Sequence, residues 1–151
     1  MHALANQIEI TSPYLNYTKD LIQFFMTEAY NYSMRSKAKR LQVGAVFVRD
    51  GRAILQGFNG TLPKTSNECE DEFGNTKPTV LHAERNGICY AARKGISLEG
   101  SDLFVTHSPC SVCASLIAAT GIRSVFYREE YRDLSGVDFL RSVAKIPVWR
   151  V

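Results

Sequence analysis

Two short motifs constrain this chain more than any other feature of its sequence. The first is His82-Ala83-Glu84, and the second, Pro109-Cys110-Ser111-Val112-Cys113, follows after 24 intervening residues. A catalytic zinc ion takes three protein ligands and keeps its fourth position for water, and one histidine with two cysteines is a recognised ligand set. The sequence therefore predicts that the two motifs meet in space, with His82, Cys110 and Cys113 as zinc ligands.

Glu84 lies two residues after the predicted histidine ligand. A closed structural zinc site has no use for this additional carboxylate, whereas a catalytic site does, because zinc lowers the pKa of a bound water to about 7 and a nearby carboxylate can move its proton. We therefore predict Glu84 as the catalytic acid and base. The combined pattern H-x-E and P-C-x-x-C matches the established signature of zinc nucleobase deaminases.

A Cys-x-x-Cys pair alone is less specific, because it also occurs in redox proteins and in structural zinc sites. One alternative is a structural zinc ion whose fourth ligand is Cys69 or Cys89, and another is a pair of buried thiols without metal. The ordered His-x-Glu motif ahead of the cysteines favours the catalytic site over both.

Composition restricts the class of protein. The 151 residues, 45% of them hydrophobic, suffice for one domain, 1–151, with a sizeable core. No apolar run reaches the ~20 residues of a membrane span, and the first residues lack the pattern of a signal peptide, so we expect neither membrane insertion nor secretion. Four cysteines, two of them in a metal motif, suit a reducing, cytoplasmic location. A net charge of +3 is too small for a protein built to hold long nucleic acid.

The pattern along the chain predicts an α/β fold. An opening helix is followed by a hairpin of two strands, a polar surface insertion at 62–78 that a partner or ligand would order, and then alternating helices and strands. This order predicts a mixed five-stranded sheet covered by helices on both faces. The expected helices are 13–36, starting near Ser12-Pro13, 82–94, 110–121 and 137–144, and the expected strands are 43–48, 53–57, 101–107, 123–127 and 146–149.

Two polar residues near the hairpin are candidates for substrate binding. Arg40 ends the basic cluster 35–40 at the mouth of the first strand, where a guanidinium can grip a phosphate. The other cations of the cluster are expected simply to face solvent. Asn59, at the end of the second strand, offers a donor and an acceptor that suit a nucleotide, although Asn59-Gly60 also fits an ordinary turn.

These motifs together resemble the cytidine and deoxycytidylate deaminase superfamily, and most of all its branch that acts on deoxycytidylate (dCMP). A histidine at position 82, where free cytidine deaminases usually carry cysteine, the long insertion before it, and Tyr131-Arg132 favour that branch. The resemblance covers roughly residues 13–150 and is carried by 43–46, 57–61, 82–86, 91–93, 109–113, Tyr127 and 131–132.

The resemblance implies a three-layer α/β/α cytidine-deaminase-like fold and hydrolysis of dCMP to dUMP and ammonia, which supplies dUMP for thymidylate synthesis. Glu84 would shuttle the protons. The alternatives are a zinc deaminase of another base, such as adenosine in tRNA, and a non-catalytic zinc-stabilised nucleotide-binding protein. The substrate-binding residues implied by the resemblance are Arg40, Asn59, Thr61, Ala83, Ser108, Pro109, Tyr131 and Arg132.

The resemblance also implies regulation, with dCTP as activator, dTTP as inhibitor, Mg²⁺ on the triphosphate, and a homohexamer. Asn86, Tyr90 and Arg93 match effector-binding positions, although Arg93 also fits a cation that favours a helix C-terminus. One zinc ion per chain is expected, because the histidines of the auxiliary zinc site of some relatives are missing.

Three residues depart from the family pattern. Arg85 stands where an apolar residue is usual, Gly87 where alanine is common, and His107 is an unusual neighbour of the Pro-Cys motif. Gly87 is expected to weaken its helix by about 1 kcal/mol relative to alanine. His107 is expected to lie behind the site rather than to contact substrate.

Overall fold

The structure is a computed structural model, which describes residues 17–151. Five strands form one sheet in the order β2-β1-β3-β4-β5, with β1 antiparallel to both β2 and β3, and with β3, β4 and β5 parallel. The predicted mixed five-stranded sheet is confirmed. The strands are β1 (Gly44–Arg49), β2 (Arg52–Phe58), β3 (Asp102–His107), β4 (Ser124–Glu129) and β5 (Val148–Arg150).

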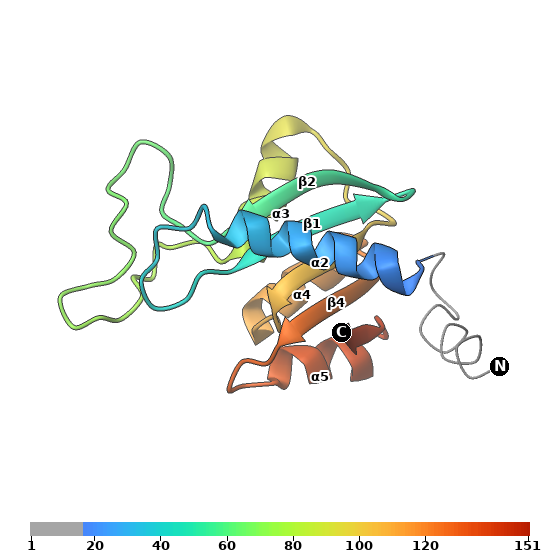
Figure 1. The fold of residues 1–151 in the computed structure, drawn as a ribbon. Coiled ribbons are helices and arrows are strands. Elements are labelled where there is room, and N and C mark those ends of the chain that lie inside the picture. The colour runs from blue at the N-terminus through green and yellow to red at the C-terminus, as the bar shows by residue number, and fades with distance from the viewer. Residues whose placement is uncertain (1–16) are drawn as a thin grey trace.

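Four helices of the described residues cover both faces of this sheet, which confirms the three-layer arrangement (Figure 1). α2 lies across one face and α3, α4 and α5 pack on the other, since the buried side chains divide into two clusters along these lines. None of these helices combines the length and apolar character that crossing a bilayer requires. The helices are α2 (Lys19–Ser33), α3 (Ala83–Lys94), α4 (Ser111–Ala119) and α5 (Ser135–Ser142).

The alternation of side chains along β1 explains how one strand serves both layers. Val46 and Val48 pack toward α2, whereas Ala45 and Phe47 pack toward α3, and all four are fully buried. The first five residues of β1 are all buried and none is polar, which is what a sheet covered on both faces requires.

The opening helix is shorter than the sequence predicted. Thr18 is its N-cap, with Oγ1 accepting a hydrogen bond from the Leu21 amide at 3.2 Å, so the helix begins at Lys19. The predicted start at Ser12-Pro13 lies outside the described residues. Among the described residues, Tyr17 and Thr18 precede the helix although the prediction included them, because the apolar spacing does not reveal the capping threonine.

Gly87 has a packing role that its helix propensity did not reveal. A Cβ atom at this position would lie 2.3 Å from Cε2 and 2.9 Å from Cζ of Phe47, whose ring is fully buried. The aromatic ring thus occupies the space that an alanine methyl would need. Glycine at this position lowers the helix propensity of α3 but allows this close contact with β1.

We therefore predict that Gly87→Ala destabilises the protein, with the free energy of unfolding in urea falling by up to about 2 kcal/mol. Overpacking costs about 1–3 kcal/mol and outweighs the ~1 kcal/mol gained in helix propensity. Cys89→Ala, on an exposed part of the same helix, is the matched control and should change little. A more stable Gly87→Ala protein would contradict this account of the α3 and β1 contact.

Candidate zinc centre and active site

The N-terminal ends of two helices bring the three predicted metal ligands together. His82 is the N-cap of α3, Cys110 is the N-cap of α4, and Cys113 lies in the first turn of α4. His82 Nδ1 lies 3.5 Å from Cys110 Sγ and 3.4 Å from Cys113 Sγ. Within residues 17–151, this is the one group of three His, Cys, Asp or Glu residues whose ligand atoms all lie within 4.8 Å of one another.

The geometry of this group fits zinc. Tetrahedral ligands at the usual Zn–N and Zn–S distances lie about 3.6 Å apart, which agrees with both nitrogen to sulfur separations. Neither Cys69 nor Cys89 belongs to the group: Cys69 is buried against Ala38 and Val80, and Cys89 is exposed. The structure therefore favours three protein ligands over a closed four-ligand site.

Neighbouring hydrogen-bond donors favour the thiolate form of Cys110, which is the form that binds metal. Hydrogen bonds from Cys113 and His82 lower the pKa of the Cys110 thiol to about 3, despite its partial burial. The Cys113 amide also donates to Cys110 Sγ at 3.5 Å, as expected for a thiolate at a helix N-terminus. Cys113 donates its own proton to this thiolate, and this hydrogen bond and burial raise its pKa, so metal binding must release that proton.

Glu84 lies in the first turn of α3, with only 4% of its surface exposed. Burial raises the pKa of its carboxyl to about 7, although the nearby His82 opposes the shift. A carboxyl with such a pKa can both accept and donate a proton near neutral pH, which is the requirement for an acid and base in one group.

Two small cavities adjoin the predicted ligands and share Asn59, His82 and Tyr131. The first, of about 20 Å³, is also lined by Val43, Ala83 and Glu84. The second, of about 230 Å³, opens toward the basic cluster and the insertion. It is lined by Arg40, Leu41, Asn59, Thr76, Val80, His82, Cys110 and Tyr131.

Among the predicted substrate-binding residues, Arg40, Asn59, Ala83 and Tyr131 thus line these cavities. The sequence analysis missed four lining residues, Leu41, Val43, Thr76 and Val80. Leu41 directly follows Arg40 and was not interpreted, and Val43 was interpreted only as the start of the strand 43–48 and of the family motif 43–46. Thr76 and Val80 lie in or just after an insertion without periodicity, so no local pattern marked them.

Asn59 connects the end of β2 to the segment before β1. Its Oδ1 accepts a hydrogen bond from the Val43 amide at 2.8 Å, and its Nδ2 donates to the Leu41 carbonyl at 2.8 Å. Asn59 therefore fixes the backbone of two cavity-lining residues, which goes beyond the ordinary turn that its sequence also allowed.

The insertion is held against the basic cluster by the chain's own contacts. Glu70 Oε2 accepts hydrogen bonds from the amides of Lys39 and Arg40 at 3.0 and 3.3 Å, and Arg40 Nη1 donates to Thr76 Oγ1 at 3.3 Å. Cys69 adds a buried apolar contact. The insertion protrudes beside the loop that precedes β1 (Figure 1), and these contacts attach it to the basic cluster.

Four predicted substrate-binding residues line neither cavity. Ser108 is fully buried and its Oγ accepts a hydrogen bond from the Tyr131 amide at 2.8 Å, so it acts on the site through Tyr131. Pro109 is buried, Thr61 is partly exposed, and Arg132 is exposed.

The predicted effector residues lie further along α3. Asn86 Oδ1 accepts a hydrogen bond from the Phe58 amide at 3.3 Å, which ties this helix to the end of β2. Tyr90 and Arg93 are exposed. Spacings of four and three residues place all three on one side of the helix.

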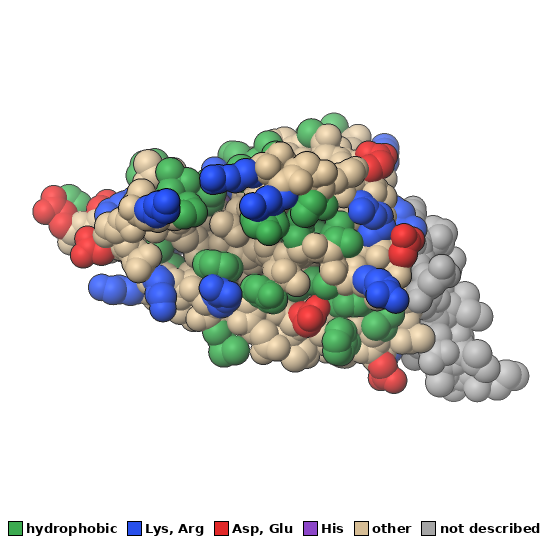
Figure 2. Space-filling view, turned by 90° about the horizontal axis from the view of Figure 1, so that it is seen from above, with side chains coloured by type: hydrophobic (Ala, Val, Ile, Leu, Met, Phe, Trp, Pro, Cys, Tyr) green, Lys and Arg blue, Asp and Glu red, His purple; other side chains and the backbone are tan. Residues whose placement is uncertain are grey.

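The charge on one face of the molecule can be compared with that of proteins that bind nucleic acid. On the face seen in Figure 2, Lys and Arg side chains are scattered among apolar and uncharged groups and do not gather into one stripe. A protein that holds long nucleic acid presents a continuous basic surface instead.

Comparison with known proteins agrees with this site. Residues 19–129 match the family model of the cytidine and deoxycytidylate deaminase zinc-binding region. Deoxycytidylate deaminase of Enterobacteria phage T4 is 33% identical over 165 residues, which cover 82% of this chain and 86% of that protein. ComE operon protein 2 of Bacillus subtilis is 36% identical over 114 residues; the match covers 73% of this chain but only 60% of that protein.

A solved structure extends the comparison to three dimensions. The dCMP deaminase from the cyanophage S-TIM5, crystallised in complex with dCMP and dUMP, superposes with a TM-score of 0.87. The two chains are 39% identical, and the match covers 90% of this chain and all of that one. The similarity therefore extends over most of the chain, and residues 19–129 of the family match include the predicted metal ligands.

Replacing any one ligand should remove the metal. We predict that Cys110→Ser, Cys113→Ser and His82→Ala each lower zinc affinity by at least about tenfold to a hundredfold, since even the partners of ligands contribute that much. Zinc per chain after dialysis against a chelator is the measurement. Cys69→Ser and Cys89→Ser are the controls. Loss of zinc from either variant would instead support a structural zinc site with four protein ligands.

Proposed function

This chain belongs to the cytidine and deoxycytidylate deaminase family, and we propose that it hydrolyses dCMP to dUMP and ammonia. The observation that carries the proposal is the placement of the buried Glu84 carboxyl in a cavity that His82 also lines, beside the Cys110 and Cys113 thiols. A cofactor site of this kind next to an acid and base is what hydrolytic deamination of a nucleobase requires.

A zinc ion held by His82, Cys110 and Cys113 would supply Lewis acidity, which lowers the pKa of a bound water to about 7. Glu84 would take one proton from the attacking water, whose oxygen would bond to C4 of the cytosine ring, and would deliver this proton to N3. The same carboxyl would then carry the remaining hydroxyl proton to the amino group, so that the C4–N bond breaks, ammonia leaves and C4 keeps the oxygen as a carbonyl. The pKa of about 7 allows Glu84 to accept and return protons within one turnover.

A monophosphate is favoured over a nucleoside by the cation at the mouth of the larger cavity. Arg40 lines this cavity, and its side chain donates to the neutral Thr76 rather than to a carboxylate, so the guanidinium charge stays available for a phosphate. Tyr131 and Asn59 line the same cavity and would contact the base and the sugar. Thr61, Ser108, Pro109 and Arg132 remain predictions from the sequence.

Regulation by dCTP and dTTP with Mg²⁺, in a homohexamer, is a further part of this proposal, as is a role in supplying dUMP in the cytoplasm. Its support is the course of α3, which carries His82 and Glu84 at one end and Asn86, Tyr90 and Arg93 beyond them. A triphosphate bound to the exposed end of this helix would act on the active site through one rigid element.

We predict that dCTP with Mg²⁺ lowers the KM for dCMP by about fivefold or more, within the usual range of coupling between sites, and that dTTP reverses this effect. Arg93→Ala should abolish the response and leave turnover without effector intact, whereas the exposed Lys19→Ala should retain it. Light scattering gives the assembly state in the same samples. If Arg93→Ala and Lys19→Ala responded equally to dCTP, Arg93 would not be part of the effector site.

Glu84→Gln tests the chemistry. We predict a fall in kcat for dCMP of about 10²–10⁴-fold or more, because the amide cannot carry the proton. Zinc content and dCMP affinity should stay within about threefold of the original protein, since Gln preserves the size and polarity of the side chain. Retention of full turnover by Glu84→Gln would exclude Glu84 as the acid and base, and unchanged ligand binding without turnover in either protein would favour a non-catalytic nucleotide-binding protein.

A further inference from the structure

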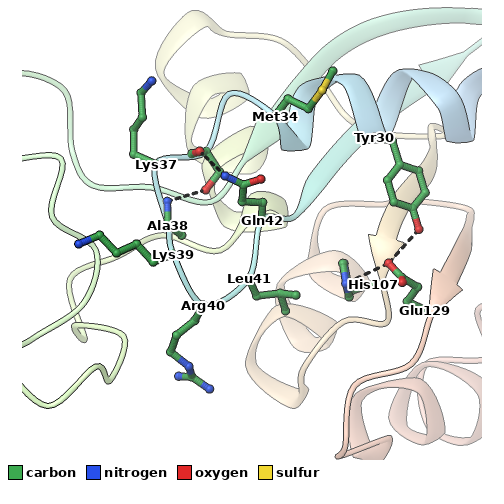
Figure 3. Close-up of a pocket in the computed structure, with 11 residues that line it drawn as sticks. Tyr30, Met34, Lys37, Ala38, Lys39, Arg40, Leu41, Gln42, His107 and Glu129 are labelled. Atoms are coloured by element: carbon green, nitrogen blue, oxygen red, sulfur yellow. Dashed lines mark hydrogen bonds and ion pairs between the residues drawn. The ribbon is translucent and has the colours of Figure 1, made fainter.

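A hydrogen-bonded cluster behind the active site joins two strand ends to α2. Glu129, the last residue of β4, lies opposite His107, the last residue of β3, in the register of the sheet. Glu129 Oε2 accepts from Tyr30 of α2 at 2.9 Å and lies 3.2 Å from His107 Nε2. Figure 3 shows the Tyr30 and His107 side chains converging on this carboxylate from opposite sides.

The partners of His107 determine its protonation. Burial lowers the pKa of the imidazole, so it is neutral near pH 7 although the adjacent Glu129 opposes the shift. A carboxylate only accepts, so Nε2 carries the hydrogen and Nδ1 is the acceptor. The buried Thr106 hydroxyl, 2.8 Å from Nδ1, must then donate to it, while Thr106 Oγ1 accepts from the Gly44 amide at 3.2 Å. Both nitrogens of the ring are therefore fixed.

The imidazole held in this way contacts a residue of the substrate cavity. The ring centroids of His107 and Tyr131 lie 6.0 Å apart at an interplanar angle of 56°, within the range of attractive aromatic pairs. The backbone adds a second link, since the Ser108 amide donates to the Glu129 carbonyl at 2.8 Å and Ser108 Oγ accepts from the Tyr131 amide. Ser108, directly after β3, thus holds the segment that leaves β4 at two points, Glu129 and Tyr131.

The contact between His107 and Tyr131 lies between two cavities. His107 lines a surface pocket of about 910 Å³ beside α2, whereas Tyr131 lines the substrate cavity, and Arg40 and Leu41 border both. Tyr131 has 36% of its surface exposed, and its hydroxyl makes no hydrogen bond among those of the described residues. The ring therefore depends on its neighbours for its orientation.

We propose that His107, held by Thr106 and Glu129, is a positioning residue that fixes the ring of Tyr131 against the substrate cavity. Only the kinetic consequence of this proposal rests on the proposed dCMP deaminase activity; the orientation of Tyr131 does not. His107 itself lines neither substrate cavity, so it acts through Tyr131 and not by contact with substrate.

The orientation can be tested by ¹⁹F NMR of zinc-loaded protein labelled with 3-fluorotyrosine, with the Tyr131 signal among the seven tyrosines assigned by Tyr131→Phe. We expect His107→Leu to move and narrow the Tyr131 signal toward that of a solvent-exposed tyrosine. Glu129→Leu, at a half-exposed position that tolerates substitution, removes the partner of Nε2 and should produce a smaller change of the same kind. Glu130→Gln, which loses only the ion pair with Arg150, is the matched control and should leave the signal unchanged.

Kinetics with dCMP supply the second measurement. His107→Leu should raise KM by about threefold to tenfold, the value of one aromatic contact, while kcat changes less than about twofold. In a double variant with Tyr131→Ala, the effect of His107→Leu should disappear, because it acts through the missing ring. If His107 had only a general structural role, the effects of His107→Leu and Tyr131→Ala on KM would be independent and would multiply.

An unchanged Tyr131 signal in both His107→Leu and Glu129→Leu would overturn the proposal, as would multiplying effects on KM. If the original protein does not convert dCMP, the proposed function fails, and the ¹⁹F result alone still decides whether His107 positions Tyr131.

Discussion

The convergence of two helix N-termini on one side of the sheet is the constraint on which the rest of this structure depends. α4 follows β3 directly and so places Cys110 and Cys113, but α3 reaches the same point only after the long insertion. Close packing fixes its approach, since a Cβ atom on Gly57 of β2 would lie 2.3 Å from the Ala83 carbonyl. The absence of that side chain lets α3 press against the sheet and present His82 to the thiols.

Where the two helix N-termini meet, neighbouring acidic groups have different pKa values. Cys110, partly exposed at a helix N-terminus, is a thiolate, whereas the buried Glu84 keeps a pKa of about 7. Both effects follow from burial and hydrogen bonding, not from residue type alone. Arg40 lines the larger cavity and Glu84 the smaller one, so in the proposed reaction the phosphate and the proton would be handled by different parts of the chain.

Sequence reasoning succeeded where a local pattern carries the information. Ligand spacing predicted that His82, Cys110 and Cys113 meet in space, as they do in the structure, and alternation along the chain predicted the sheet and its helices. It failed where the outcome depends on contacts between distant segments. Thr76 reaches the cavity beside Arg40, to which it is hydrogen-bonded, and Gly87 is required by the ring of Phe47. No periodicity or propensity in the chain encodes these partners.

The most direct test of the account is the change in ultraviolet absorbance when the zinc-loaded protein is given dCMP or deoxycytidine, with Arg40→Ala examined in parallel. The account predicts conversion of dCMP, with kcat/KM for deoxycytidine lower by about 10²-fold or more because the phosphate contact is missing. Arg40→Ala should bring the two substrates closer together. Equal conversion of both substrates would contradict the phosphate site, and no conversion of either would contradict the assignment of dCMP as substrate.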